Sequence, residues 1–592
     1  MKDSLTKIIS LFDQKEKKML VGLLLMMIIA AIFETCGVGL IVPIVGLLTN
    51  PNIIQEQSAL SYIYKLFNFQ STTSFIVFAV IGLLVVFLLK NIYLLLYNHV
   101  QMKVILNQQV KLSRRLFREY LTKPYTFHLQ RNTATLLRNV NTEVTRVFGG
   151  IIISGFQLFT EILVTIFILL LLLFTEPIAT ITATILLGGS VLLFFKIFNK
   201  KISTLGREQH RISALMIKWV NQGLGASKEV KVSGKEEFFI NAYTAQSKTS
   251  ANNNRYMGML QQVPRLFIET LLVAIVLITM LIIVFQGMST DHLVSTMALF
   301  AMAAFRLTPS INKVVSLITQ IRYCQPALQI VHEDLFLNKE PIIIDNNNNN
   351  KLQEKDEREK AFVDAIELVD VSFRYPNQNE YSVRDVSLSI PIGHSVAFIG
   401  ESGAGKTTLV DIILGLYQPE KGQVKVDGKN IFEHKKLWQK SIGYIPQSIF
   451  LSDDTIRCNV AFGIEEEEID ESAVWKALEQ AQLKDFVQAL PDQLETKVGE
   501  RGVRLSGGQR QRIGIARALY HNPEILFMDE ATSALDNETE KDIMKAIDGL
   551  KGEKTLIIIA HRLSTIENCD TVFRLSNGRM VSVEEKLEKS AI

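Results

Sequence analysis

The chain has 592 residues, which is too long for one ordinary globular domain. Its 63 basic and 60 acidic residues nearly balance, so the composition gives no indication of a nucleic-acid partner. The cysteines have neither metal-ligand spacing nor the pattern of an extracellular disulfide framework, and we interpret them as incidental thiols. They are Cys36, Cys324, Cys458 and Cys569.

The first part of the chain holds six segments long and apolar enough to cross a bilayer, which takes about 20 residues each. In hydrocarbon every backbone polar group must be bonded within the chain, so these segments are predicted to be helices. They lie near residues 19–48, 74–98, 145–174, 177–198, 260–286 and 291–318. The first is too long for the core of a cleaved signal peptide, so we interpret it as an uncleaved membrane helix.

The loops between these segments predict their orientation. Residues 99–146 hold nine Lys or Arg and two acids, and residues 199–263 hold ten Lys or Arg and four acids. The other loops are nearly free of basic residues, so both termini and both long loops are expected in the cytoplasm. Few helix breakers interrupt the long loops, which predicts that the membrane helices continue through them at about 1.5 Å per residue.

Residues 53–69 follow the first predicted span and lie on the outer side in this orientation. Apolar positions such as Ile54, Tyr62 and Phe67 alternate there with polar ones. The pattern is typical of a short amphipathic helix lying on the membrane surface, and a plain connector is the alternative.

The chain changes character after the last predicted span. Residues 338–360 contain the run Asn346–Asn350 and then many charges, which is typical of a solvated linker. We therefore predict a membrane domain over 1–337 and an α/β nucleotide-binding domain over 361–592.

A phosphate-binding loop of the pattern G-x-x-x-x-G-K-[ST] follows the apolar segment 395–399 and opens a predicted helix. Its glycines let backbone amides approach phosphates, and the helix N-terminus adds positive potential. The side chain of Lys406 is expected to reach the β- and γ-phosphates of ATP, and Thr407 to ligate Mg²⁺. The loop consists of Gly400, Glu401, Ser402, Gly403, Ala404, Gly405, Lys406, Thr407 and Thr408.

A second apolar segment, 525–528, ends in two carboxylates. Asp529 is placed to hold Mg²⁺, directly or through water, and Glu530 to accept a proton from the attacking water. Phosphoryl transfer needs little beyond positioning and neutralisation of charge, so these groups suffice for ATP hydrolysis.

In these motifs the sequence resembles the ATP-binding cassette superfamily. The resemblance assigns Tyr375 to stacking on adenine, Gln447 to Mg²⁺ and the attacking water, and His561 to the γ-phosphate. Residues 496–502 resemble an exporter-specific loop, and 533–536 the loop that crosses between two sites. The superfamily's signature is present as Ser506, Gly507, Gly508 and Gln509.

The resemblance also implies an assembly. In this superfamily the signature closes over ATP from a second copy of the domain, so one cassette is incomplete. A chain with one cassette and six spans is then expected to form a homodimer with twelve helices and two ATP sites. Turns near 125–132 and 220–227 resemble the coupling helices that dock on cassettes. The expected location is the inner membrane of a bacterium.

Charged residues within the predicted spans are candidates for cargo binding, because charge is costly in a membrane. Lys90, Arg265 and Arg306 fall in the second, fifth and sixth spans and would suit a phosphate or pyrophosphate headgroup. The alternative is that cations in the spans snorkel to the interface or pair with glutamates. The glutamates are Glu34, Glu161 and Glu269, and a further cation, Lys313, is interpreted as a membrane-edge charge.

Three segments, 33–43, 263–269 and 305–310, resemble the bacterial flippases of lipid-linked oligosaccharides. This favours an ATP-driven flippase or exporter of an anionic lipid-linked glycan. An exporter of a peptide, toxin or small amphipathic drug is the alternative. A soluble cassette protein acting on nucleic acid is disfavoured by the six spans, and a gated channel by the complete catalytic set.

Overall fold

The structure is a computed structural model of the whole chain. It describes residues 2–40, 44, 47, 58–175, 177–285, 290–337, 362–376, 378–529, 545, 547–560, 566 and 568–585. The chain forms two compact units. The first comprises Met1–Lys123 and Arg131–Ile342, and the second comprises Pro124–Gln130 and Ile343–Ile592. We call them the membrane unit and the cassette unit.

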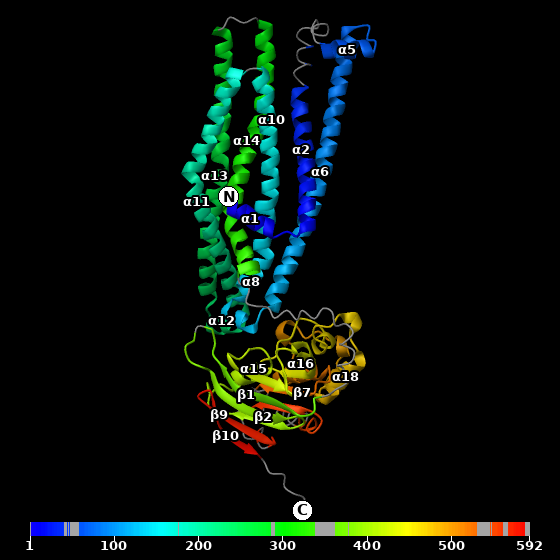
Figure 1. Ribbon diagram of the computed structural model, residues 1–592, viewed down its shortest axis with the longest axis vertical. Helices are drawn as coiled ribbons and strands as arrows, with labels where there is room; N and C mark the ends of the chain where they lie inside the picture. Colours follow the sequence, from blue (N-terminus) through cyan, green and yellow to red (C-terminus); the bar gives the residue numbers. More distant parts are fainter. Residues whose placement is uncertain are drawn as a thin grey trace, which may run out of the picture. The chain divides into compact units, whose positions relative to one another are not determined.

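The membrane unit is helical (Figure 1), and each predicted span overlaps a long helix. The predicted span 19–48 extends beyond α2 into residues that are mostly outside the described part, and the predicted span 145–174 begins in the short helices α9 and η2. The long helices are α2 (Gln14–Gly39), α6 (Thr72–Thr122), α10 (Ser154–Thr175), α11 (Pro177–Gly225), α13 (Glu236–Phe285) and α14 (Thr290–His332). The short ones are α1 (Lys2–Ser10), α5 (Ser58–Leu66), α8 (Thr133–Arg138), η1 (Asn139–Glu143), α9 (Val144–Arg146), η2 (Val147–Ile153), α12 (Ser227–Ser233) and η3 (Glu333–Leu337). Helix α5 confirms a helix within 53–69, of which 53–57 lie outside the described residues.

Three helical stretches of the described part are long and apolar enough to cross a membrane: Gln14–Gly37, Thr72–Thr122 and Thr133–Phe174. Helix α6 has 51 residues and would extend about 77 Å at 1.5 Å per residue, against about 30 Å for the hydrocarbon core. Helices α6, α11 and α13 thus run without a break from the predicted spans into the basic loop segments, as expected for helices that continue beyond the membrane.

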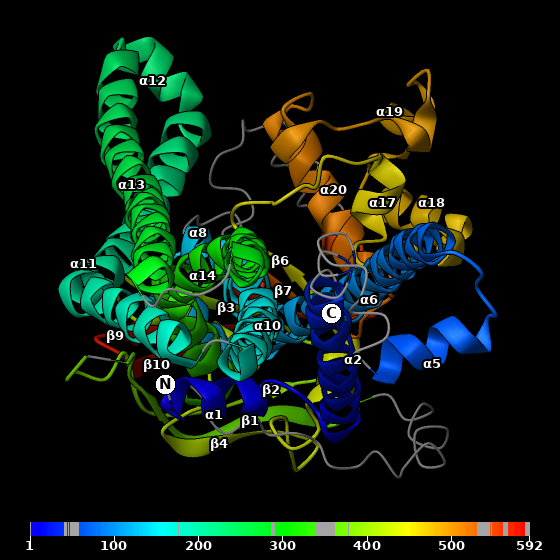
Figure 2. The same ribbon diagram turned by 90° about the horizontal axis from the view of Figure 1, so that it is seen from above.

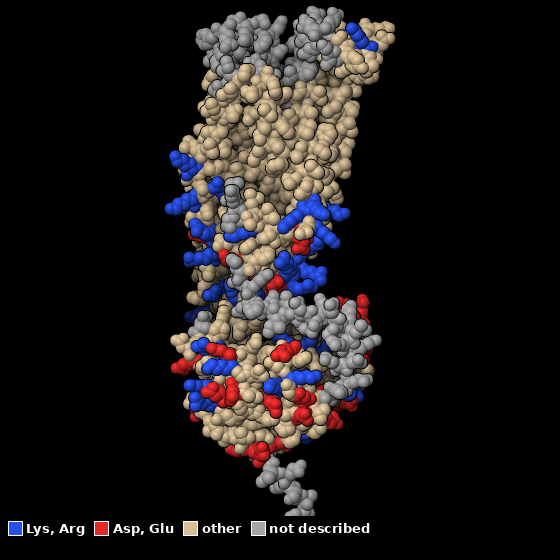
Figure 3. Space-filling view, viewed as in Figure 1, with Lys and Arg blue, Asp and Glu red and all other residues tan. Residues whose placement is uncertain are grey.

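Charge is distributed unevenly along these helices. On the face shown in Figure 3, Lys and Arg side chains of the membrane unit gather toward one end of the long helices, while the described side chains along most of the remaining length are uncharged. On α6 five of the six basic residues lie in the C-terminal half, Lys103, Lys111, Arg114, Arg115 and Arg118, and the sixth is Lys90. This separation fits the predicted division into a buried and a cytoplasmic part.

The helices pack in pairs. Figures 1 and 2 both show α2 beside α6 and α11 beside α13, and extensive contacts join each pair. Helix α11 passes close to α14 at Gly206, where an added Cβ would lie 2.3 Å from the carbonyl oxygen of Tyr323. Only glycine therefore permits this approach.

A buried network of polar side chains connects helices of the membrane unit at the end where its basic residues lie. Glu143 is fully buried, and its Oε1 accepts from Arg146 at 3.1 Å and pairs with His210 Nδ1 at 2.9 Å. Nearby, Asp334 accepts hydrogen bonds from Tyr120 and from Asn139. Of these residues only Glu143 and Arg146 were counted from the sequence, as charges in a loop. Burying such groups is tolerated because each has partners.

The cassette unit contains a six-stranded sheet of order β10-β9-β3-β8-β7-β6 and a four-stranded sheet of order β2-β1-β4-β5. The strands are β1 (Ala365–Phe373), β2 (Val383–Pro391), β3 (Ser395–Ile399), β4 (Lys421–Val426), β5 (Lys429–Asn430), β6 (Ile442–Ile445), β7 (Ile525–Asp529), β8 (Thr555–Ile559), β9 (Thr571–Ser576) and β10 (Arg579–Glu585). The central strands are parallel and buried on both faces, as continuous apolar runs predict.

Helices surround the sheets of the cassette unit. They are α7 (Tyr125–Gln130), α15 (Lys406–Ile413), α16 (Lys435–Ser441), α17 (Ile456–Val460), η5 (Glu466–Glu468), α18 (Glu471–Gln480), α19 (Lys484–Gln488), η6 (Gln493–Glu495), η7 (Glu500–Gly502) and α20 (Gly507–Leu519). The observed architecture, long membrane helices with an α/β P-loop domain, is the predicted fold class.

We predict that Gly206→Ala lowers the thermal unfolding midpoint of the detergent-solubilised protein, because the new methyl group meets a backbone carbonyl. Overpacking of this kind costs about 1–3 kcal/mol. Gly189→Ala on the same helix is the control, since its Cβ would have no neighbour within 4 Å. A G206A protein that melts no lower than G189A would contradict the close packing of α11 and α14.

Candidate functional site

The predicted ATP-site segments meet at one edge of the parallel sheet. Strand β8 pairs with both β3 and β7, so the carboxyl ends of β3 and β7 lie two strands apart. The phosphate loop leaves β3, and Asp529 is the last residue of β7. Ligands of open parallel sheets bind at the carboxyl ends of the strands, and the candidate nucleotide site lies there.

The phosphate loop requires glycine at defined positions. Gly400, Gly403 and Gly405 have φ of +148°, +83° and +96°, a region that side chains rarely adopt. A Cβ on Gly400 would lie 2.2 Å from the carbonyl oxygen of Leu575, and one on Gly405 would lie 2.5 Å from that of Ser382. The loop can take this path only without side chains there, which leaves its backbone amides open to a phosphate group.

Helix α15 begins with the two residues predicted to contact phosphate and metal. Lys406 is 5% exposed, and its ammonium donates to the carbonyl oxygens of Gly400 at 2.8 Å and Glu401 at 3.0 Å. These bonds hold the positive charge within the loop. Thr407, the next residue, is exposed in the first turn of the helix. A helix N-terminus with a lysine and an outward hydroxyl suits the triphosphate of a nucleotide.

A half-buried carboxylate, Asp411, lies one helical turn after Thr407. Burial, followed by the charge of Asp529, raises the pKa of Asp411 to about 7. Two carboxylates that repel one another favour a bound cation. Asp411 was not among the residues predicted from sequence, although its i, i+4 spacing from Thr407 was a usable signal.

The donor set fits Mg²⁺. Thr407, Asp529 and the exposed Gln447, two residues after β6, offer the oxygen ligands that this ion prefers. Among the residues that the structure describes, no group of three or more His, Cys, Asp or Glu forms a protein-only metal site. The remaining ligands would therefore be nucleotide phosphates and water, as is usual for Mg²⁺.

Tyr375 lies beside the phosphate-binding helix. Its hydroxyl is 3.0 Å from the Thr408 hydroxyl, and its ring packs edge-on against Phe373 at 5.3 Å. It also lines a hollow of about 490 Å³ with Arg374, Gln418 and Glu420 among its neighbours. A half-buried ring at the rim of a hollow can receive a nucleobase.

The signature segment opens helix α20 with a capping box. Ser506 Oγ accepts from the backbone N–H of Gln509 at 3.2 Å, and Gln509 Oε1 accepts from the N–H of Ser506 at 2.9 Å. The serine hydroxyl proton stays available to a ligand, and the first N–H groups of the helix add positive potential. Gln509, predicted to bind nucleotide, thus has a capping bond in this structure.

Several predicted site residues lie outside the described part of the chain. They are Glu530, His561 and the segment 533–536. Their positions in the sequence can still be given relative to the described strands. Glu530 follows β7 directly, and His561 comes two residues after β8, the strand between β3 and β7.

The predicted cargo residues differ from one another in environment. Lys90 Nζ lies 3.4 Å from Glu34 Oε2 and 4.7 Å from the centroid of the Phe87 ring, with both charged side chains largely buried. Lys313 Nζ lies 2.9 Å from Glu161 Oε1. Pairing of span cations with glutamates, the alternative considered for the sequence, is therefore observed at these two sites.

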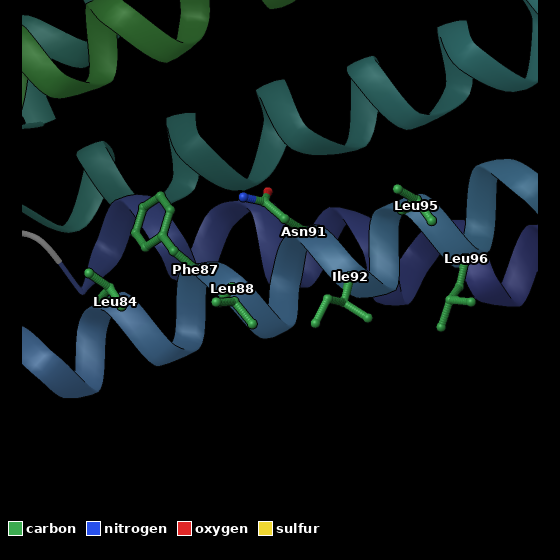
Figure 4. Close-up of a pocket in the computed structure, with 7 residues that line it drawn as sticks. All are labelled: Leu84, Phe87, Leu88, Asn91, Ile92, Leu95 and Leu96. Atoms are coloured by element: carbon green, nitrogen blue, oxygen red, sulfur yellow. The ribbon is translucent and has the colours of Figure 1, made fainter.

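Arg265 and Glu269 are exposed on α13, and among the described residues Arg265 has no hydrogen bond or ion pair. Arg306 lies in α14, and its side chain is outside the described part. A shallow apolar hollow of about 470 Å³ runs along α6, with Phe87 and Asn91 among its lining residues (Figure 4). Phe87, whose ring lies beside Lys90, thus borders an apolar surface that contains one amide side chain, that of Asn91.

Known proteins resemble both units. The family described as "ABC transporter" matches residues 383–533, and the "ABC transporter transmembrane region" matches residues 37–307. An "ATP-dependent lipid A-core flippase" of Saccharophagus degradans is 34% identical over 521 residues, covering 86% of this chain and 84% of the relative. A protein of the same description from Cupriavidus metallidurans is 32% identical, covering 80% of this chain and 78% of that one.

A solved structure also matches over nearly the whole chain. The bacterial Atm1-family ABC exporter with ATP bound has a TM-score of 0.73 at 21% identity, covering 97% of this chain and 96% of that one. At this level of identity the match supports the fold alone.

We predict that Gly400→Ala weakens ATP binding about tenfold or more, because the methyl group would displace the loop from the Leu575 carbonyl. Gly403→Ala is the matched control, since it shares the strain of a positive φ but its Cβ would meet no atom within 4 Å. Fluorescence titration with trinitrophenyl-ATP measures both. Equal affinities for the two variants would contradict the assigned loop geometry.

Proposed function

The chain belongs to the ABC transporter family, and we propose that it works as a homodimeric flippase that moves an anionic lipid-linked glycan across a bacterial inner membrane. It is an ATP hydrolase coupled to transmembrane transport. The observation that carries the cargo proposal is the likeness, over more than four-fifths of the chain, to a lipid A-core flippase. That protein's named cargo is a lipid bearing a glycan.

Each predicted ATP-site residue has a proposed role. The phosphate loop and Lys406 bind the triphosphate, and Tyr375 stacks on the base. Thr407, Asp529 and Gln447 would hold Mg²⁺, which supplies charge neutralisation on the phosphates when bound. Glu530, directly after β7, orients the attacking water and takes its proton. His561 contacts the γ-phosphate.

The second copy of the chain completes each site. Ser506, with its capping box intact, presents a hydroxyl proton and a helix N-terminus suited to the γ-phosphate. Two ATP molecules bound between the two cassettes then hold the cassettes together, and hydrolysis lets the cassettes separate. The proposed boundaries are 1–337 for the membrane domain, 338–360 for the linker and 361–592 for the cassette, with both termini cytoplasmic.

The cargo site combines charge with apolar surface. Arg265 is an exposed cation within a predicted span that has no ion pair among the described residues, and Arg306 is its proposed partner for a phosphate or pyrophosphate group. The positive charge of Lys90 is paired with the carboxylate of Glu34, so we propose that Lys90 contributes less to anion binding than the two arginines. The apolar hollow along α6 suits the lipid chain of such a cargo.

We predict that Glu530→Gln retains ATP binding and loses steady-state hydrolysis by at least about a hundredfold, the usual contribution of a general base. Release of inorganic phosphate and binding of trinitrophenyl-ATP give the two readouts. Glu524→Gln is the control, a carboxylate that precedes β7 and accepts from the Phe362 N–H. Hydrolysis by E530Q at the normal rate would identify another residue as the base.

We predict that Arg265→Ala and Arg306→Ala each slow movement of a pyrophosphate-linked glycolipid about tenfold, the value of one charge-assisted hydrogen bond, while basal ATP hydrolysis persists. Proteoliposomes with labelled glycolipid measure this, and Arg255→Ala, exposed on the same helix, is the control. Normal glycolipid movement by the R265A/R306A double variant would remove the anion site. Movement of an amphipathic peptide in place of the glycolipid would favour the exporter alternative.

A further inference from the structure

Tyr417 lies at the centre of an aromatic cluster in the cassette unit. Its side chain is 3% exposed, and its ring stacks on Phe373 at 5.0 Å with an interplanar angle of 13°. The ring of Tyr375 meets it edge-on, at 5.6 Å and 80°. The proposed adenine-stacking ring is therefore supported from behind by two rings that water does not reach.

A third contact comes from a distant part of the chain. Tyr125 begins helix α7, and its ring lies 5.9 Å from that of Tyr417. The segment Pro124–Gln130 belongs to the cassette unit by its contacts, although it follows α6 directly in sequence. Tyr417 thus contacts both the proposed base-binding ring of Tyr375 and the first residue of α7, the short helix that follows the 51-residue α6 in the chain.

The position of Tyr417 is fixed by the phosphate-binding helix. After α15 the backbone turns at Gly415, which has φ of +78°, and the N–H groups of Leu416 and Tyr417 both donate to the Asp411 carbonyl at 2.9 and 3.4 Å. Tyr375 is tied to the same helix through Thr408. A displacement of either tyrosine ring must therefore be accommodated by the other or by α15.

The chemistry of Tyr417 limits how it can act. Burial, with Tyr375 as the next contribution, raises the pKa of its hydroxyl above the ordinary value. The side chain is therefore neutral at physiological pH. It therefore acts through packing and hydrogen bonding with the residues that it contacts, and not through charge.

We propose that Tyr417 is a positioning residue that couples stacking of the nucleotide base on Tyr375 to the seating of helix α7. The inference rests on the proposed role of Tyr375. Base binding orders the Tyr375 ring, which holds Tyr417 against Tyr125. Coupling between two sites is reciprocal. The factor by which base binding favours the seating of α7 is therefore the factor by which a seated α7 raises the affinity for the base.

The reciprocity supplies the test. The full-length chain in lipid nanodiscs is titrated, with Mg²⁺, with a non-hydrolysable ATP analogue (AMP-PNP) and with tripolyphosphate, which lacks the base. Tyr125→Ala, at a ring that is 43% exposed, is expected to weaken the analogue about fivefold, the lower end of usual coupling between sites. Tripolyphosphate affinity is expected to stay unchanged, because no base is present to be stacked.

A double-mutant cycle separates coupling from loss of structure. Tyr417→Leu is expected to weaken the analogue at least as much as Y125A, and the double variant no more than Y417L alone. Tyr417→Phe keeps the ring and is expected to bind within about twofold of the unsubstituted chain. Wild-type affinity of Y125A for the analogue would overturn the inference, as would equal losses for the analogue and for tripolyphosphate.

Tyr375→Ala distinguishes failure of this inference from failure of the proposed function. If Y375A binds the analogue as tightly as the unsubstituted chain, the adenine contact itself is wrong. If Y375A binds it weakly and Y125A binds it normally, the base is stacked as proposed but α7 does not sense it. A loss in Y375A, Y417L and Y125A together, with tripolyphosphate unaffected, supports the whole path.

Discussion

The path of the phosphate loop is the constraint on which the cassette depends. At Gly400 and Gly405 the backbone passes within contact distance of neighbouring carbonyl oxygens, so no side chain fits there. This path directs the loop into α15, whose first turn carries Lys406 and Thr407. The same helix positions Asp411 beside Asp529, the proposed Mg²⁺ ligand, and, through the turn that follows, Tyr417 beside Tyr375. One helix therefore positions residues proposed to contact phosphate, metal and base.

The sequence predicted this part well because its constraints are local. A glycine pattern, an apolar strand before it and a helix after it leave few alternative structures. The observed β3 has the bounds expected for 395–399, and β7 ends at Asp529 as expected. The partner of Lys90 was not predictable in the same way. Whether a lysine in a span faces a ligand or Glu34 depends on the rotation of two helices, α2 and α6, about their axes, which sequence periodicity of an almost uniformly apolar helix does not specify.

Contacts between distant segments were the other source of missed features. Glu143 and Arg146 read as loop charges in sequence, yet they meet His210 in a buried network once the helices continue past the membrane. Tyr125 and Tyr417 are nearly 300 positions apart and carry no shared motif. Such pairs appear only when packing brings the segments together.

The central claim is that one copy of the chain holds half of each ATP site. Nanodiscs assembled with one copy and with two copies of the chain, separated by mass and matched in lipid, allow ATP hydrolysis per chain to be compared directly. Steady-state phosphate release is expected from the two-copy discs, with at most about a hundredth of that rate from the one-copy discs, because Ser506 and the N-terminus of α20 come from the partner. Equal rates per chain in both preparations would contradict the account.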